Sequence, residues 1–260
     1  MASRLESEVG EFKARFRYPD SKVFKEIIDG VSKIIDEARF TVSSEGLILK
    51  GMDPAKVAYI EVYVPAESFV ELEVRDGEAF MGVNVEVLKN IVKRGKKGDP
   101  FEARILDDKV YFSIESSLVK RYLLPNLDVV VEAPERIELE HDVKVAVISD
   151  VVKKALRDAE VVGDIVEFEA DEDRLLIRGV GEGRHRAETR IEPGSPSVSL
   201  FEVKSPATSR YDVSYLKRVV NLAKIADTVT IGFSSDRPIE LVFNSPDGSR
   251  VRFLLAPSTT

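Results

Sequence analysis

The chain has no cysteine, no tryptophan and only two histidines among its 260 residues. The lack of cysteine excludes disulfide bonds, thiol catalysis and thiolate metal sites. His141 and His185 have no nearby nucleophile in a recognisable motif, so we expect both to be surface residues. No apolar run is long enough to cross a membrane, and the N-terminus lacks a secretory signal pattern. We therefore expect a soluble, intracellular protein with no membrane partner.

Two short segments could suggest a bound ligand, but neither carries a complete motif. Residues 171–173 form an acidic cluster between two expected strands, where a solvated tight turn is the better interpretation than a metal site. Gly179, Gly181 and Gly183 resemble a phosphate-binding loop, yet no helical pattern and no Lys-Ser/Thr pair follows them. We therefore expect no metal, no cofactor, no nucleotide site and no catalytic residue.

The chain repeats itself at a spacing of 128 residues. A five-residue run that starts at Leu47 returns with conservative changes at Leu175, and a helical pattern that starts at Val85 returns at Val213. Self-similarity over such a distance indicates two tandem domains. We expect a flexible extension at 1–10, domains at 11–124 and 137–257, an interdomain linker at 125–136 and a tail at 258–260.

The apolar pattern predicts the same elements in both copies. Helices are expected at 21–36, 85–94, 150–159 and 213–224, with N-caps at Ser21, Asn84, Ser149 and Asp212. Strands are expected at 12–17, 39–42, 47–50, 57–64, 69–74, 101–106, 110–114, 119–124, 137–147, 165–170, 175–178, 184–191, 229–233, 239–243 and 251–255. Short connections favour antiparallel sheets with the helices packed on one face, which is an α+β class.

Basic residues gather on the four expected helices, although the net charge is −8. Each helix carries at least as many basic as acidic residues, whereas the acidic excess lies on strands, loops and linker. Exposed helix faces are often charged, so solvation alone is one explanation. The shared sign on all four helices favours a positive surface that faces phosphate. That surface comprises Lys22, Lys25, Lys33, Lys89, Lys93, Arg94, Lys97, Lys153, Lys154, Arg157, Lys217, Arg218 and Lys224.

Four short motifs, taken with the repeat, resemble a known family. They are Gly51-Met52-Asp53-Pro54-Ala55-Lys56-Val57, Met81-Gly82-Val83-Asn84, Asp236-Arg237-Pro238 and Leu254-Leu255-Ala256-Pro257. Over residues 11–257 the chain resembles the sliding clamps of the proliferating cell nuclear antigen family, most of all the archaeal members. The resemblance implies a non-enzymatic DNA polymerase processivity factor that lies with the chromosome in the cytoplasm. Its trimeric ring of six such domains would encircle duplex DNA irrespective of sequence, with helices lining the hole.

The resemblance also implies two protein-binding regions. The contact with two further clamp subunits would join two edge strands, with Val119, Lys120, Arg121 and Tyr122 on one and Arg184, Arg186, Glu188 and Arg190 on the other. DNA polymerase, clamp loader, flap nuclease and DNA ligase would insert a hydrophobic peptide into a pocket made by Met52, Lys56, Val57, Val131, Ala133, Pro134, Pro238, Leu254, Leu255, Ala256 and Pro257. The family commonly has an aromatic residue where Leu254 stands and a bulkier aliphatic residue where Ala133 stands.

Several alternatives stay open at this point. Both expected edge strands are basic and would repel each other in a homotrimer unless Glu188 and its neighbours compensate, so a heterotrimer is the other possibility. An enzyme with its site between the two copies would need convergent titratable residues near the linker, and no motif supplies them. A protein-interaction scaffold without DNA contact would be unaffected by charge reversal at Lys93 and Arg94.

Overall fold

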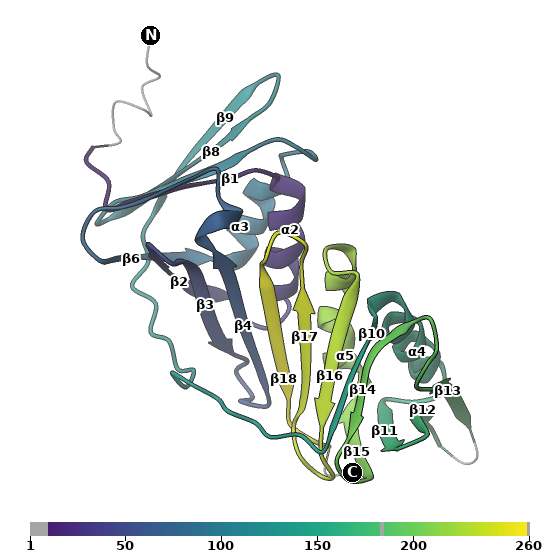
Figure 1. Ribbon diagram of the computed structural model, residues 1–260. Helices are drawn as coiled ribbons and strands as arrows, with labels where there is room; N and C mark the ends of the chain where they lie inside the picture. Colours follow the sequence, from purple (N-terminus) through teal and green to yellow (C-terminus); the bar gives the residue numbers. More distant parts are fainter. Residues whose placement is uncertain (1–9, 183–184, 259–260) are drawn as a thin grey trace. The chain divides into compact units, whose positions relative to one another are not determined.

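The protein folds into two compact units, seen in a computed structural model that describes residues 10–182 and 185–258 (Figure 1). Unit 1 contains residues 10–52, 60–133 and 246–250, and unit 2 contains residues 53–59, 134–245 and 251–258. The main division falls between residues 133 and 134, within the expected linker. Each unit also includes a short segment from the other sequence copy, namely 53–59 in unit 2 and 246–250 in unit 1.

Unit 1 is built from two antiparallel sheets and two helices. The first sheet has the order β5-β1-β7-β8-β9, formed by β1 (Ala14–Tyr18), β5 (Glu71–Val74), β7 (Phe101–Ile105), β8 (Lys109–Glu115) and β9 (Val119–Pro125). The second has the order β4-β3-β2-β6, formed by β2 (Glu37–Ser43), β3 (Gly46–Met52), β4 (Ala58–Pro65, in this unit from residue 60) and β6 (Glu78–Asn84). Helices α2 (Ser21–Val31) and α3 (Val85–Val92) pack against each other, and a 3-10 turn, η1 (Ala66–Ser68), follows β4.

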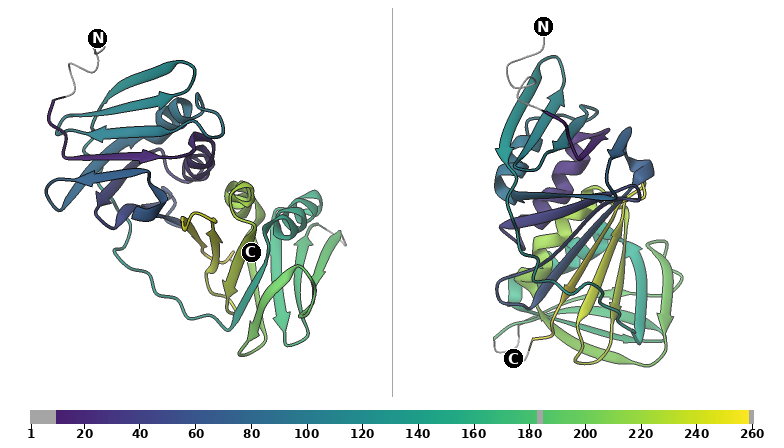
Figure 2. Two further views of the ribbon diagram at one scale, coloured as in Figure 1. Left: turned by 45° about the horizontal axis from the view of Figure 1, so that its top comes forward. Right: turned by 90° about the vertical axis from the view of Figure 1, so that its left-hand side faces the viewer.

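Unit 2 repeats this plan. Its first sheet has the order β14-β10-β16-β17-β18, formed by β10 (Val143–Ile148), β14 (Val198–Val203), β16 (Thr228–Phe233), β17 (Ile239–Asn244) and β18 (Arg250–Leu255, in this unit from residue 251). Its second has the order β13-β12-β11-β15, formed by β11 (Ile165–Asp171), β12 (Arg174–Val180), β13 (Arg186–Ile191) and β15 (Ala207–Asp212). Helix α4 (Ser149–Val162) covers β12 and packs on α5 (Val213–Val219), which continues as the 3-10 helix η2 (Val220–Lys224) (Figure 2). The α+β class with tandem domains is confirmed.

The repeated five-residue segments lie on β3 and β12, and their glycines allow close packing against the neighbouring chain. A Cβ atom on Gly51 would lie 2.6 Å from the Cδ1 atom of Ile35, which follows α2. A Cβ atom on Gly179 would lie 2.5 Å from the carbonyl oxygen of Ala159 in α4. Contacts this short leave no room for a side chain. Gly179 therefore serves packing, which argues against the phosphate-loop interpretation.

Two of the four expected N-caps are confirmed, and two are wrong. The side chains of Asn84 and Asp212 accept hydrogen bonds from amides in the first turns of α3 and α5. Helix α2 is capped by Asp20, whose carboxylate accepts from two amides, while Ser21 is buried and donates to a backbone carbonyl instead. At α4, Ser149 is the first helical residue and no side chain caps the helix. The Ser21 hydroxyl is engaged with the Asp99 carbonyl, and the Asp20 carboxylate caps the helix.

The apolar pattern missed three strands and misplaced several ends. Strands β6, β14 and β15 were not predicted; no residue of β14 is fully buried, and the buried face of β15 includes the polar Ser209. Helix α2 ends at Val31 instead of residue 36, whereas α4 runs on to Val162. Strand β10 begins at Val143 instead of residue 137. Residues 126–142, all described, form neither helix nor strand. The extended linker is therefore longer than predicted.

Candidate functional site

The basic residues of unit 1 that belong to α2 and α3 are partly neutralised by their neighbours. Lys33 Nζ lies 3.0 Å from the carboxylate of Asp29, one helical turn away. Lys89 reaches from α3 to the α2 segment, with its Nζ 3.3 Å from Ser32 Oγ and 4.0 Å from the Asp29 carboxylate. Lys25 pairs with its neighbour Glu26 at 2.9 Å. These three cations therefore also hold the helices in place.

Unit 2 repeats the cross-helix contact at matching positions. Lys217 on α5 stands 128 residues after Lys89, and it pairs with Glu160 on α4, which stands 128 residues after Ser32. Lys154 pairs with Asp150 at 2.9 Å within α4. Lys224, in η2, is exposed. The repeat thus extends from the backbone to the side chains that join the helices.

A smaller set of helix cations has no carboxylate partner. Within the described part of the chain, no ion pair involves Lys22, Lys93, Arg94, Lys97, Lys153 or Arg157. Lys93, Arg94 and Lys97 are exposed and lie together at the C-terminal end of α3. Lys153 and Arg157 stand one turn apart on α4. The positive surface therefore includes these two groups and the exposed Lys22 on α2, which are available to an external phosphate.

Unit 2 brings two parts of the expected partner pocket together. The amide of Ala256, after β18, donates to the carbonyl oxygen of Val57 at 2.9 Å. The side chain of Val57 is 37% exposed, whereas Leu254 and Leu255 are almost fully buried. Val57 therefore has exposed apolar surface, whereas the two leucines are core residues.

Asp53 closes the 53–59 loop and was missed by the sequence analysis. Its buried carboxylate accepts from the amides of Val57 (2.8 Å) and Ala58 (2.7 Å) through Oδ1. Its Oδ2 accepts from the hydroxyl of Tyr215 on α5, at 3.1 Å. Lys56, exposed at the tip, adopts a left-handed φ of 58°, which such a tight loop requires. An aspartate that begins a tight loop and bonds its own amides is a recognisable signal that could have identified it.

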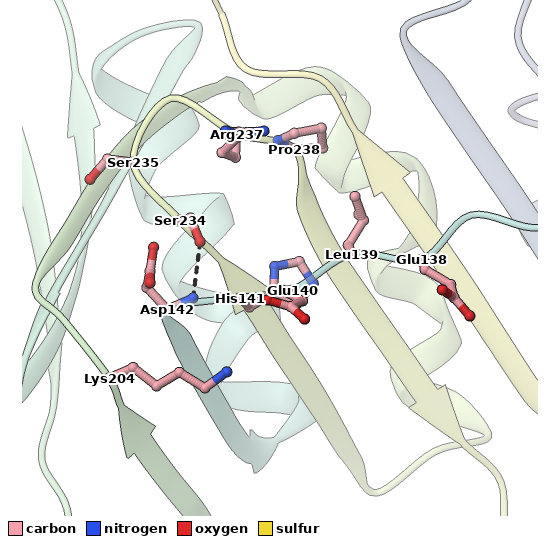
Figure 3. Close-up of a pocket in the computed structure, with 10 residues that line it drawn as sticks. All are labelled: Glu138, Leu139, Glu140, His141, Asp142, Lys204, Ser234, Ser235, Arg237 and Pro238. Carbon is pink, nitrogen blue, oxygen red and sulfur yellow. Dashed lines mark hydrogen bonds between the residues drawn. The ribbon is translucent and has the colours of Figure 1, made fainter.

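The turn at 234–238 borders two further pockets of unit 2. Pro238 lines one of about 630 Å³ together with residues 138–142 and Lys204 (Figure 3). There the amide of Asp142 donates to Ser234 Oγ at 2.9 Å, which attaches the end of the linker to the turn. Pro257 lines the other, of about 750 Å³, together with residues 208–210 and Asp236. Pro238 therefore lies in the 234–238 turn, and Pro257 lines a pocket that the same turn borders.

The remaining expected pocket residues lie at the start of the loop and in the linker. Met52, which ends β3, is half-buried and belongs to unit 1, as do the half-buried Val131 and Ala133. Pro134 is exposed and belongs to unit 2. Their part in the pocket stays a prediction.

His141 is not the surface residue that we expected. Its side chain is 9% exposed, and its Nε2 lies 3.0 Å from the Glu240 carboxylate. The ring occupies the space over Gly232, where a Cβ atom would come within 2.5 Å of it. Burial opposes ionisation of Glu240, but hydrogen bonds with His141 and Arg252 outweigh burial and lower the pKa of Glu240. His141 therefore anchors the linker's end to the sheet.

The other candidate ligand positions are an exposed histidine and a turn. His185 is exposed, as expected. Asp171 Oδ1 accepts from the amides of Asp173 (2.9 Å) and Arg174 (3.0 Å), which confirms a turn. Over the described residues, no three His, Asp or Glu side chains gather as a metal site would require. No helix in the same residues is long and apolar enough to span a membrane.

The two expected subunit-contact strands, β9 and β13, each end a sheet within their own unit. Lys120 on β9 donates to a backbone carbonyl at 2.6 Å, and Tyr122 is half-buried. On β13, Glu188 is bound by Arg178 of its own sheet at 2.7 Å, so it offers little compensation to the basic residues. Arg186 donates to backbone carbonyls, whereas Arg190 pairs with Glu192 at 2.8 Å. Arg121 is half-buried, and Arg184 lies outside the described residues.

By contrast, the outer edge of β6 in unit 1 is covered. The linker begins along it: Gly82 donates to Asn126 Oδ1 at 2.8 Å, and the Leu127 amide donates to the Gly82 carbonyl at 2.9 Å. A covered edge cannot add a strand from another chain. The edge of β6 is therefore unavailable, whereas β9 and β13 are the sheet edges to which the resemblance assigns the subunit contact.

Comparisons with known proteins show which family the chain is similar to. A sequence model described as "Proliferating cell nuclear antigen, N-terminal domain" matches residues 12–129. The chain is 56% identical over 246 residues to "DNA polymerase sliding clamp 1" of Aeropyrum pernix, covering 94% of this chain and 99% of that protein. It is 34% identical over 241 residues to the "DNA polymerase sliding clamp" of Pyrococcus horikoshii, covering 92% and 96%.

Two solved structures share the fold. One is the proliferating cell nuclear antigen of Thermococcus kodakaraensis, with a TM-score of 0.87, 24% identity, and coverage of 94% of this chain and 100% of that chain. The other is a complex of PCNA2 with PCNA3 from Sulfolobus tokodaii, with a TM-score of 0.87, 22% identity, and coverage of 95% and 100%. The similarity extends over nearly the full length of each chain.

Proposed function

Because the chain belongs to the proliferating cell nuclear antigen family of sliding clamps, we propose that it is a processivity factor that encircles duplex DNA and tethers DNA polymerase to it. Its relatives over nearly the whole chain are named DNA polymerase sliding clamps. The family is one of non-enzymatic processivity factors, of archaeal type here. The observation that carries the DNA-facing assignment is that the cations without a carboxylate partner include a group just after α3 and a group on α4, in a chain of net charge −8.

Weak phosphate contacts suit this function. Long basic side chains that touch phosphates bind DNA irrespective of sequence and lose affinity as salt rises. A ring is held on DNA by its topology, so strong binding is not needed and would slow sliding. We therefore assign the main DNA contact to Lys93, Arg94 and Lys97, with Lys153 and Arg157 as the second group.

Charge reversal tests this assignment. The Lys93→Glu/Arg94→Glu double variant should reduce the length of polymerase extension products about tenfold, because it turns attraction for phosphate into repulsion. The matched control is Lys13→Glu/Lys144→Glu, which changes the net charge equally at exposed positions outside the helices. The control should extend DNA as the unmodified clamp does. Normal processivity of the helix variant would instead favour a protein scaffold without DNA contact.

The partner pocket is the second part of the proposal. The exposed apolar side chain of Val57, held beside the C-terminal Ala256, supports a site for the apolar anchor of a partner peptide. DNA polymerase, clamp loader, flap nuclease and DNA ligase are the proposed partners. Val57→Glu should weaken binding of a labelled peptide with an aromatic and aliphatic anchor at least about tenfold. Val70→Glu, a change at another exposed valine in unit 1, should have no effect; equal effects would refute the site.

The third part concerns the ring. Strands β9 and β13 end their sheets, both carry basic residues, and Glu188 is engaged by Arg178. We therefore propose that the chain assembles with sister subunits whose edges are more acidic. The heteromeric PCNA2–PCNA3 complex of Sulfolobus tokodaii supports this arrangement. Light scattering should find the isolated chain smaller than a trimer and a trimer after sister subunits are added; a stable trimer of the chain alone would contradict it.

A further inference from the structure

Tyr215 stands between two functional regions of unit 2. It lies on α5, the helix that carries Lys217 and Arg218. Its hydroxyl donates to Asp53 Oδ2 at 3.1 Å, and the guanidinium carbon of Arg218 lies 3.9 Å from the centroid of its ring. One side chain thus contacts both Arg218, which the sequence predicts to face DNA, and the carboxylate that closes the 53–59 loop.

The contacts continue from Asp53 to the peptide site. Asp53 Oδ1 holds the amides of Val57 and Ala58, and the carbonyl of Val57 holds the amide of Ala256. The carboxylate is buried, so the position of its two oxygens determines where Val57 lies. Tyr215 supplies the hydrogen bond that fixes the second oxygen. Removing that bond would loosen the apolar contact that the loop offers to a partner.

The electrostatics of Tyr215 depend on both neighbours. Burial and then the hydrogen bond to Asp53 raise the pKa of the phenol, while the nearby Arg218 charge lowers it. The cation over the ring withdraws electron density, which makes the hydroxyl a better donor to Asp53. A phosphate that draws Arg218 away from the ring would weaken this donor and relax the loop.

We propose that Tyr215 is a positioning residue that couples the basic face of α5 to the partner loop at 53–58, so that polyanion binding at α5 weakens peptide binding at the loop. The inference rests on the proposed function, because it concerns the same pocket. Coupling between two binding sites is reciprocal, so the peptide also weakens polyanion binding. The clamp would therefore hold its partners less tightly where DNA touches α5 directly.

Fluorescence anisotropy of the full chain tests the coupling. The probe is a labelled peptide with an aromatic and aliphatic anchor, titrated with and without a short DNA duplex at low salt. For the unmodified chain, the duplex should raise the peptide dissociation constant about threefold. Tyr215→Phe should bind the peptide about fivefold more weakly and show no duplex dependence, because the hydrogen bond is already lost.

Two further variants separate coupling from general loosening. Tyr63→Phe removes a hydroxyl that donates to the Glu45 carbonyl at 3.3 Å in unit 1, and it should retain both the affinity and the duplex dependence. Arg218→Gln should bind the peptide as the duplex-bound chain does, while Lys217→Gln keeps the duplex dependence. Hydrogen exchange should be faster at the Val57 and Ala58 amides in Tyr215→Phe, with the melting temperature little changed.

The outcomes distinguish this inference from the proposed function. If the unmodified chain does not bind the peptide, the proposed pocket is wrong and the coupling falls with it. If it binds the peptide with the same affinity in the presence of duplex, the pocket stands and the coupling is refuted. Retained duplex dependence in Tyr215→Phe, or unchanged exchange at the two amides, would also overturn the role of Tyr215.

Discussion

Each unit includes a short segment of the other sequence copy, and in both units a tyrosine hydroxyl donates to an aspartate of that segment. The surroundings of the two tyrosines differ. In unit 1 the Tyr18 hydroxyl donates to Asp247, and in unit 2 the Tyr215 hydroxyl donates to Asp53. Tyr18 is 1% exposed and packs against Phe24 and Phe69 with ring centroids 5.3 and 5.8 Å away. Tyr215 is half-buried beneath the Arg218 cation on α5. The same chemistry therefore serves the core in one unit and the proposed binding surface in the other.

Each aspartate also accepts hydrogen bonds from residues of its own loop. Asp247 accepts from the amide of Ser249 at 3.0 Å and from its hydroxyl at 2.9 Å, in the turn between β17 and β18. Ser68 further donates to the Asp247 carbonyl at 2.6 Å. Asp53 likewise accepts from two amides of its loop. Local hydrogen bonds shape the loop, and the distant tyrosine decides where it docks.

The largest expected effect comes from removing the aspartate that serves the core. Asp247→Ala leaves the buried Tyr18 hydroxyl and the Ser249 amide without an acceptor, and it should lower the free energy of unfolding by about 3 kcal/mol. Denaturant titration of the purified chain measures the loss. The control is Asp108→Ala at an exposed turn, which should change stability by less than about 0.5 kcal/mol. Equal losses would show that Asp247 has no special role.

A smaller effect separates the two tyrosines. Tyr18→Phe should cost about 2 kcal/mol of unfolding free energy, because the half-buried Asp247 carboxylate loses the donor that the buried tyrosine supplies. It should leave peptide affinity unchanged, because both residues belong to unit 1 and the proposed peptide site to unit 2. Tyr215→Phe should cost less than about 1 kcal/mol while weakening the peptide. Parallel denaturation and binding measurements on both variants check this. If both variants lose stability and affinity in the same proportion, the contrast between core and surface roles is wrong.

The sequence predicted most of the fold because its signals are local or repeated. Helical spacing located α3 and α5, and the 128-residue echo matched their caps, Asn84 and Asp212. The same spacing could not predict the end of α2, because the apolar pattern continues through Ile34 and Ile35 although the helix ends at Val31. Strand β15 was not predicted, because its alternating buried positions include small and polar residues such as Ser209. Burial of such residues depends on neighbours that come from elsewhere in the chain.

The candidate site was predictable in outline and not in detail. The basic helix faces follow from periodicity, but which cations carry a carboxylate partner depends on contacts such as Lys89 with Asp29 and Lys217 with Glu160 across two helices. The loop signal of Asp53 is local, but its contact with Tyr215 could not be predicted, because the two residues are 162 positions apart. His141 was misread for the same reason, since its carboxylate partner lies 99 residues further along the chain.

The dependence of unfolding free energy on alkaline pH should show the smallest effect, and it distinguishes Tyr18 from Tyr215 most selectively. Burial is the main cause that raises the pKa of both Tyr18 and Tyr215, and hydrogen bonds to aspartate add to it. In the unfolded chain these phenols ionise near pH 10, whereas the folded chain keeps their protons. Their stabilising contribution is therefore fully present below about pH 10 and is lost as the pH rises further towards the folded pKa.

The more completely buried phenol should account for more of this loss. Tyr18→Phe should flatten the fall in unfolding free energy between about pH 10 and 11.5, since phenylalanine has no proton to lose. Tyr215→Phe should flatten it less, because its ring is only half-buried and Arg218 already favours the ionised form. Denaturant midpoints measured across that range for the unmodified chain and both variants decide the matter. A larger flattening in Tyr215→Phe would mean that the surface pair is the more strongly desolvated, and the assignment of Tyr18 to the core and Tyr215 to the binding surface would have to be reversed.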